Sequence, residues 1–271
     1  MMRDITLGQY YPGDSVIHKA DPRAKIVITV IYITTIFLAK SLYAYAAVAA
    51  SALVLIIISG VSVKVLLKGF KPVIFIVIIT GVMNIFFTTG VEPLFEWWVI
   101  RIYPEGLKAA GLMVMRIIVL ILGGSLLLTY TTTPIALTDG IEQLLSPLKK
   151  IKVPVHDFAM MMTIALRFIP TLLEETDKIM NAQKARGADF SNGGLVSRAK
   201  ALIPVLIPLF VSAFRRADEL AVAMECRCYR GDEGRTRMTR LKFSARDFIL
   251  IFCAAAFCAS VVLLNIFFAA A

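Results

Sequence analysis

The sequence predicts an all-α membrane protein with about five transmembrane helices and a cytoplasmic helical domain that contains two long crossing helices. Three observations predict this fold class. Hydrophobic residues make up 58% of the 271-residue chain, and the mean hydropathy of +0.78 exceeds that of soluble domains. Several uncharged apolar runs are long enough to cross a bilayer. A polar stretch with helical periodicity separates the fourth of these runs from the last.

The first part of the chain is expected to hold a lead-in and four spans. Residues 1–25 are polar and turn-rich, which is typical of a cytoplasmic N-terminal lead-in on the membrane surface. Within residues 26–130, transmembrane helices are predicted over 26–39, 41–63, 72–91 and 107–130. The first run is short for a span, so Lys25 and Lys40 are expected to snorkel to the two interfaces and lengthen it.

Arg116 is the one charge well inside a predicted span, and it has two interpretations. A charge at that depth is costly unless it is paired or faces a polar interior, and Asn84 on the third span is a possible partner. Alternatively, Arg116 lies nearer the outer face and snorkels to it. The sequence leaves both interpretations open.

Residues 131–247 are too long for a loop and too regular for a linker. They begin with a threonine N-cap and proline, which predict a short helix to about Leu145. A long helix is predicted from about Val155 to Lys184, kinked at Pro170, and a second one from about Ser197.

Three alanines at four-residue spacing on the second long helix, Ala213, Ala217 and Ala221, predict close approach of a partner backbone. Residues 248–271 are then read as the final transmembrane helix.

The basic residues are distributed unevenly among the loops. With a cytoplasmic N-terminus, the segments expected inside carry 25 of the 29 Lys and Arg residues. The positive-inside bias therefore favours five spans in a prokaryotic plasma membrane, with the N-terminus in the cytoplasm and the C-terminus outside. This distribution also accounts for the net charge of +10 without nucleic acid, since no basic run is interleaved with stacking aromatic residues.

Both long helices end in a short arginine motif, Ala185-Arg186-Gly187 and Cys226-Arg227-Cys228. A single motif of this kind fits a helix cap, because arginine suits the C-terminal end of the helix dipole and glycine suits the position after the cap. Two such motifs on helices expected to pack together favour a second interpretation. The planar guanidinium groups of Arg186 and Arg227 would bind carboxylates on a partner protein.

The sequence contains no phosphate-binding loop, no His-Glu-x-x-His zinc motif and no Gly-x-Ser-x-Gly nucleophile turn. His18 and His156 are far apart and are interpreted as surface or interface residues. The four cysteines and two histidines suggest neither a disulfide framework nor a metal site. We therefore expect no enzymatic activity, no cofactor and no metal ion in this chain.

The chain resembles the transmembrane T component of energy-coupling factor transporters, a branch of the ABC transporters, and the resemblance spans nearly its whole length. The matching stretches, in the family's order, are Tyr11-Pro12-Gly13-Asp14-Ser15, Asp21-Pro22-Arg23, Thr131-Thr132-Thr133-Pro134, Gly140-Ile141-Glu142-Gln143-Leu144-Leu145, Pro147-Leu148, Leu166-Arg167-Phe168-Ile169-Pro170, the two arginine motifs and Gly234-Arg235-Thr236.

The resemblance implies a scaffold without catalytic residues that takes part in uptake of vitamins or transition-metal ions. Residues 131–247 would be a coupling domain, in which Arg167 and Pro170 belong to the structure of the coupling helices. The two arginine motifs would dock into two cytoplasmic ABC-type ATPases, which bind the ATP. A separate small membrane protein, the S component, would bind the substrate.

The second arginine motif departs from the family's Ala-Arg-Gly, since Cys226 replaces alanine and Cys228 replaces glycine. We expect the contact of Arg227 to be kept and the backbone packing around it to be altered. An alternative function is a self-contained secondary transporter, which would require polar or broken helices near the membrane midplane. An intramembrane enzyme would require convergent polar residues within the spans, and the sequence shows none.

Overall fold

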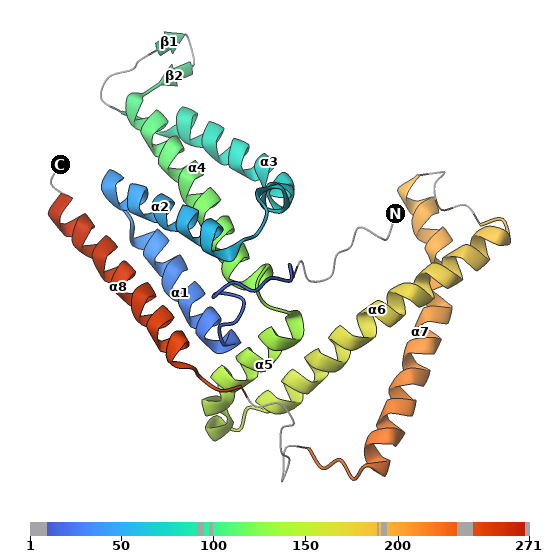
Figure 1. Cartoon of the computed structure of the whole chain (residues 1–271). Coiled ribbons are helices and arrows are strands. Elements are labelled where there is room, and N and C mark those ends of the chain that lie inside the picture. The colour runs from blue at the N-terminus through green and yellow to red at the C-terminus, as the bar shows by residue number, and fades with distance from the viewer. Residues whose placement is uncertain are drawn as a thin grey trace. The chain divides into compact units, whose positions relative to one another are not determined.

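A computed structural model describes residues 10–90, 95–97, 100–188, 190, 194–231 and 241–268 (Figure 1). Helices dominate these residues, which confirms the all-α class. The helices are α1 (Pro22–Leu38), α2 (Leu42–Ser59), α3 (Val63–Phe87), α4 (Pro104–Gly124) with its π-helical extension η1 (Ser125–Thr129), α5 (Pro134–Leu145) with the 3-10 turn η2 (Ser146–Ile151), α6 (Val155–Ala185), α7 (Leu195–Cys226) and α8 (Ala245–Phe268). A two-stranded antiparallel hairpin, β1 (Phe95–Trp97) and β2 (Ile100–Ile102), lies between α3 and α4.

The chain divides into two compact units. The first, which we call the membrane unit, falls within Gly8–Ile141 and Leu241–Ala271, and the second, the helical arm, falls within Glu142–Arg240. The arm is therefore narrower than the segment 131–247 expected from sequence. Residues 131–141 and 241–247, on either side of the arm, belong to the membrane unit. They are held there by hydrogen bonds to residues far away in the sequence, such as Thr131 to Lys25 and Asp247 to Asp21.

Four helices of the described chain are long and apolar enough to cross a membrane, and they cover Leu42–Ser59, Lys64–Phe87, Pro104–Thr129 and Ala245–Phe268. The fifth expected span corresponds to α1, which has 17 residues. At the helical rise, α1 is about 25 Å long, which is shorter than the roughly 30 Å hydrocarbon core. α1 packs against α8 and α4, whereas α3 packs mainly on α4 (Figure 1).

The core of the membrane unit lies where α1, α2, α4 and α8 meet. Ile36 of α1 and Val261 of α8 are both almost fully buried there. Gly123 near the end of α4 lets the ring of Tyr32 come close, because a Cβ on Gly123 would lie 2.0 Å from that ring. A larger residue at position 123 would therefore force the Tyr32 ring to move.

Lys25 does not snorkel to an interface, which corrects the expectation from sequence. Its side chain is almost fully buried, and its ammonium group donates to the carbonyl of Thr131 at 2.8 Å, to Thr132 Oγ1 at 3.2 Å and to the carbonyl of His18 at 3.2 Å. Burial of an ammonium group is tolerated when all its donors are satisfied. Lys25 thus ties the lead-in and the residues after η1 to the start of α1.

A carboxylate at the start of α8 also holds the start of α1. Asp247 accepts hydrogen bonds from the backbone N–H of Asp21 at 2.9 Å and of Ser244 at 2.8 Å. Asp21 in turn caps α1 by accepting from the N–H of Arg23 at 2.9 Å. The guanidinium of Arg23 lies 4.0 Å from the centre of the Phe243 ring. These contacts explain the Asp-Pro-Arg motif and place residues 241–247 in the membrane unit.

Arg116 is paired within the protein, so the first of its two interpretations holds in this structure. Its Nη2 donates to the carbonyl of Ala39 at 3.1 Å and to the hydroxyl of Tyr45, and the guanidinium lies 5.3 Å from the centre of the Tyr45 ring. The suggested partner Asn84 instead donates to the carbonyl of Thr80 on its own helix at 2.9 Å. Arg116 therefore joins α4 to the turn between α1 and α2.

Candidate functional site: the ends of the two long helices

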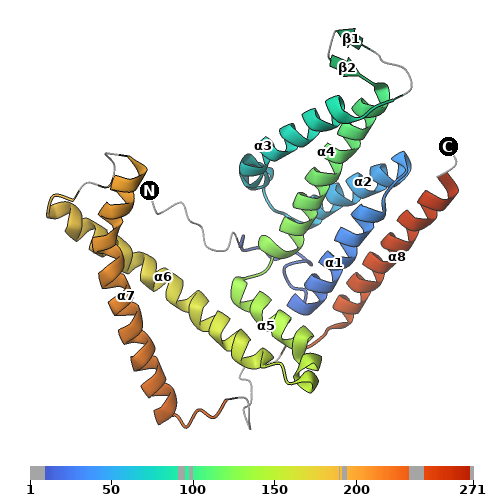
Figure 2. The same ribbon diagram turned by 180° about the vertical axis from the view of Figure 1, so that it is seen from behind.

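The helical arm is built on α6 and α7, which have 31 and 32 residues and contact each other. α6 begins at the predicted residue and ends within one residue of the predicted end. It runs through Pro170 without interruption, and α7 likewise contains Pro204 and Pro208. Figures 1 and 2 show the two helices crossing, with the C-terminal half of α7 leading away from α6.

The crossing is held by one buried apolar residue and one polar cluster. Val205 is only 3% exposed. About three turns further along α7, Arg216 Nη2 lies 3.1 Å from Glu175 Oε2 of α6. A hydrogen bond from Ser212, opposed by partial burial and supported by the charge of Arg216, lowers the pKa of the Glu175 carboxyl from its ordinary value. The carboxylate of Glu175 therefore joins two turns of α7 to α6.

Among the described residues, only the first alanine of the stripe lies beside the contacts between α6 and α7. Ala213 is half-buried, but Ala217 and Ala221 are exposed. Small residues permit close approach without supplying a partner surface, and Ala213 lies between Ser212 and Arg216, the two α7 residues that bond to Glu175 of α6, whereas Ala217 and Ala221 lie beyond them. The C-terminal alanines thus leave an exposed face on α7.

The first arginine motif closes α6 with a Schellman turn. Arg186 is the C-cap residue, with φ −86° and ψ 5°. Gly187 follows with φ 88°, its N–H donates to the carbonyl of Lys184 at 2.9 Å, and the N–H of Ala188 donates to the carbonyl of Gln183 at 3.0 Å. Both hydrogen bonds define this motif, and the left-handed residue in it is usually glycine.

The second motif closes α7 in the same way, although it lacks glycine. Arg227 is the C-cap residue, with φ −91° and ψ 11°. Cys228 takes the left-handed conformation with φ 55°, its N–H donates to the carbonyl of Glu225 at 2.8 Å, and the N–H of Tyr229 donates to that of Met224 at 3.1 Å. The backbone turn is therefore retained, with a cysteine at the position where glycine is favoured.

The side chains of both motifs project into solvent. Ala185, Arg186, Gly187, Cys226, Arg227 and Cys228 are all exposed. Within the described residues, neither guanidinium group makes a hydrogen bond or an ion pair. The capping interpretation thus accounts for the backbone, and the arginine heads remain available to a partner.

The other predicted coupling-helix residues, Arg167 and Pro170, are exposed on α6 and do not pack in the arm. Sequence reasoning missed the pair of Arg216 with Glu175 and also a second polar pair in the arm. His156 Nδ1 lies 2.8 Å from Glu142 Oε1, both side chains are largely buried, and the pair joins the end of α5 to the start of α6. Its signal in the sequence is weak, because the two residues are 14 apart and separated by a turn bracketed by prolines.

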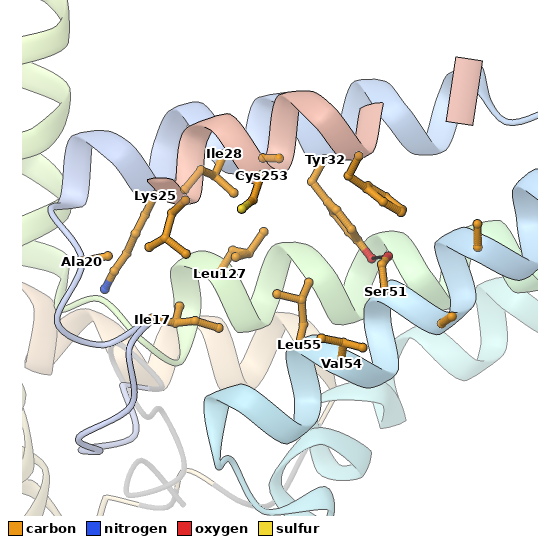
Figure 3. A pocket seen from close by; sticks show the side chains of 15 residues that line it. Ile17, Ala20, Lys25, Ile28, Tyr32, Ser51, Val54, Leu55, Leu127 and Cys253 are labelled. Carbon is orange, nitrogen blue, oxygen red and sulfur yellow. Dashed lines mark hydrogen bonds between the residues drawn. The ribbon is translucent and has the colours of Figure 1, made fainter. Parts of the chain in front are cut away.

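The membrane unit contains a cavity of about 550 Å³ among α1, α2 and α8 (Figure 3). Its lining is apolar apart from three side chains, Lys25, Tyr32 and Ser51. The ammonium group of Lys25 already makes three hydrogen bonds, and Ser51 Oγ lies 3.4 Å from the Tyr32 hydroxyl. The cavity therefore presents almost no uncommitted polar group to a polar substrate.

Comparison with known proteins identifies the family. Residues 13–238 match the family described as "Cobalt transport protein". The chain is 58% identical over 255 residues to the "Energy-coupling factor transporter transmembrane protein EcfT" of Clostridium kluyveri, covering 94% of each chain. It is 57% identical over 250 residues to the protein of that name from Ruminiclostridium cellulolyticum, covering 92% of this chain and 93% of the relative. The Bacillus subtilis protein of that name is 47% identical over 247 residues, covering 91% and 93%. The chain therefore belongs to the family of energy-coupling factor transporter transmembrane proteins and is a membrane component of such a transporter.

Proposed function

We propose that this chain is the non-catalytic coupling subunit of an ATP-driven importer for vitamins or transition-metal ions. Two cytoplasmic ABC-type ATPases bind the helical arm and carry the ATP. A separate small membrane protein, the S component, binds the substrate. Motion driven by ATP passes through α6 and α7 to the S component.

The observation that carries this proposal is the repeated arginine turn. Arg186 and Arg227 cap two different helices with one backbone conformation, and both heads are exposed. Two equivalent arginine turns suit two equivalent docking partners. The planar guanidinium group of arginine presents its donors in a fixed arrangement, so it loses little entropy for each hydrogen bond that it forms with a carboxylate.

The arm also exposes apolar surface of the kind that a partner covers. Along α7, exposed large apolar side chains lie on four successive turns, at Leu202, Leu206, Phe210 and Phe214. Contiguous apolar surface of this sort marks a protein interface or contact with a membrane. We assign it to the contacts of the arm with the S component and the surrounding lipid.

The proposed orientation follows from the charges. A cytoplasmic N-terminus puts 25 of 29 Lys and Arg residues on the inner side, together with the arm that the ATPases must reach. Reporter fusions at residues 3 and 271 test this orientation. Opposite sides for the two ends support it, and a shared side would require a different number of spans.

A self-contained secondary transporter is the alternative function. Its substrate site would need converging polar groups among the spans. The cavity among α1, α2 and α8 is nearly apolar, and its one charged group is already bonded to Thr131 and Thr132. This lining favours the coupling subunit.

Affinity purification from the native membrane distinguishes the two functions. The proposal predicts that two ATPases and a small membrane protein co-purify with the chain, and that uptake in proteoliposomes requires all of them. Substrate uptake by the purified chain alone would support the secondary transporter and overturn the proposal.

A further inference from the structure

Three lysines at the start of α3 lie on one side of the helix. Lys64, Lys68 and Lys71 are separated by four and three residues, which places them within one narrow stripe along the helix. All three are exposed. On the opposite side, Leu66 is only 4% exposed and packs in a cluster with Tyr130 at the end of η1. The first two turns of α3 are therefore amphipathic and are anchored through their apolar side.

This segment takes a different direction from the span that follows it. Figures 1 and 2 show the first turns of α3 nearly end-on, while the rest of the helix runs across the view. Pro72 lies inside the helix immediately after the third lysine, and an internal proline kinks a helix because it removes a hydrogen bond. The bend allows the segment Val63–Lys71 to follow the membrane surface while the span crosses it.

The lysine stripe directly precedes an uncharged apolar stretch of α3 and has no counter-charge among the described residues. Residues 72–87 are uncharged and about 24 Å long as a helix. No carboxylate in the described part of the chain pairs with these lysines, and no acidic residue lies in the first turn of α3. Ser62 makes no side-chain cap, so the positive end of the helix dipole adds to the lysine charges.

We propose that Lys64, Lys68 and Lys71 form a binding surface for the headgroups of anionic phospholipids. The lipid phosphates meet the ammonium groups, and the acyl chains cover the exposed side of the following span. That span has protein neighbours on one side only, because α3 packs mainly on α4 and just 6% of its residues are buried. Bound lipid would cover the side of α3 that has no protein neighbour and would hold the first turns of α3 parallel to the membrane surface.

The position of the lysines selects a lipid as the occupant. A protein partner at this surface would have to fit between the headgroups and the lysines, at the edge of an apolar helix whose exposed side chains include Phe75 and Ile79. Surface lysines attract anionic leaflets with a strength that corresponds to on the order of a fivefold gain in binding for each lysine. The attraction decreases with added salt.

The test compares lipid retention by purified full-length protein in neutral detergent, using native mass spectrometry. Equal amounts of phosphatidylglycerol and phosphatidylcholine are offered to the wild type, to a Lys64→Gln, Lys68→Gln, Lys71→Gln variant and to a Lys178→Gln, Lys184→Gln, Lys200→Gln variant. The second variant removes the same charge from exposed positions of α6 and α7. Size-exclusion profiles confirm that both variants remain folded.

We expect the wild type and the second variant to retain severalfold more phosphatidylglycerol than phosphatidylcholine. We expect the α3 variant to lose this preference, and the preference of the wild type to fall as sodium chloride rises. An unchanged preference in the α3 variant would overturn the proposal. Equal loss in both variants would also overturn it, because it would show a response to net charge rather than to this surface.

Discussion

Arg186 and Arg227 end two different helices with nearly the same backbone angles, −86° and 5° at one residue and −91° and 11° at the other. The residue after each arginine is left-handed, glycine in the first case and cysteine in the second. The turn at the end of α7 therefore has the same geometry as the turn at the end of α6, although it has cysteine at the position where glycine is preferred. The two motifs are therefore equivalent in backbone structure, which supports the proposal that both are docking elements.

Cys228→Gly should stabilise the protein. Cys228 adopts φ 55°, and a non-glycine residue in the left-handed region costs roughly 1 kcal/mol. Gly187→Ala should destabilise by a similar amount, because it introduces the same cost at φ 88°. Thermal unfolding of the purified protein measures both changes, with Cys226→Ala in the last turn of α7 as the control. A lower melting temperature for Cys228→Gly would show that the residue is not held in this conformation.

The contact between α6 and α7 should depend on pH through Glu175. The pKa of its carboxyl is lowered in the folded chain, chiefly by the hydrogen bond from Ser212 and also by Arg216. Its ionised form therefore stabilises the crossing above the ordinary carboxyl pKa of about 4.5, and this stabilisation is lost as the pH falls through the lowered value. Spin-label distances between the helices should widen in that acidic range. Glu175→Gln should remove the pH dependence, and a wild type insensitive to acid would contradict the role of Glu175.

Arg116→Met should destabilise the membrane unit. The change leaves the carbonyl of Ala39 and the hydroxyl of Tyr45 without their donor, at a cost of about 1–3 kcal/mol. Arg116→Lys should recover only part of this, because the lysine side chain is one atom shorter and does not place its ammonium group at the position of Nη2, which donates both hydrogen bonds. A double-mutant cycle with Tyr45→Phe measures the coupling. Additive effects of the two changes would mean that Arg116 and Tyr45 do not interact.

Ala217→Leu should leave the isolated chain nearly unchanged, within about 0.5 kcal/mol, because Ala217 is exposed. If a partner of the transporter covers this face, the larger side chain should weaken assembly or uptake. Melting temperature and co-purification separate the two effects, and Val196→Leu on the exposed start of α7 is a matched control. A strongly destabilised isolated chain would show that Ala217 is packed after all.

The sequence predicted the long helices well, because apolar periodicity and capping residues act locally. Helix α6 begins at the expected Val155, and the glycine after Arg186 correctly indicated the end of the helix. The left-handed Cys228 could not be predicted, because cysteine carries no preference for that conformation. Cys228 adopts this conformation because the two hydrogen bonds of the turn, from the N–H groups of Cys228 and Tyr229, require a left-handed residue at this position.

Long-range polar contacts could not be predicted from the sequence. Lys25 was expected at an interface, but one of its partners is the backbone carbonyl of Thr131, 106 residues away. Every residue has a backbone carbonyl, so the sequence does not show which of them accepts a distant hydrogen bond. Asp247 was assigned to the arm, but it caps α8 and bonds to Asp21 at a separation of 226 residues. The alanine stripe permitted a close crossing on α7, but the polar contact with Glu175 extends only to Arg216, so that Ala213 lies beside it and Ala217 and Ala221 remain exposed.

The most direct test of the coupling function is co-purification of the ATPases with an Arg186→Glu, Arg227→Glu variant. If each arginine binds a carboxylate on its own ATPase, truncation of such a pair costs on the order of 2–5 kcal/mol, and charge reversal adds repulsion. The matched control is Lys184→Glu with Arg230→Glu, which changes the same charge at exposed neighbouring positions. The account predicts that the arginine variant inserts into the membrane at the wild-type level but loses the ATPases and substrate uptake, while the control keeps both. Co-purification and uptake near the wild-type level in the arginine variant would show that these residues serve only as helix caps and would contradict the account.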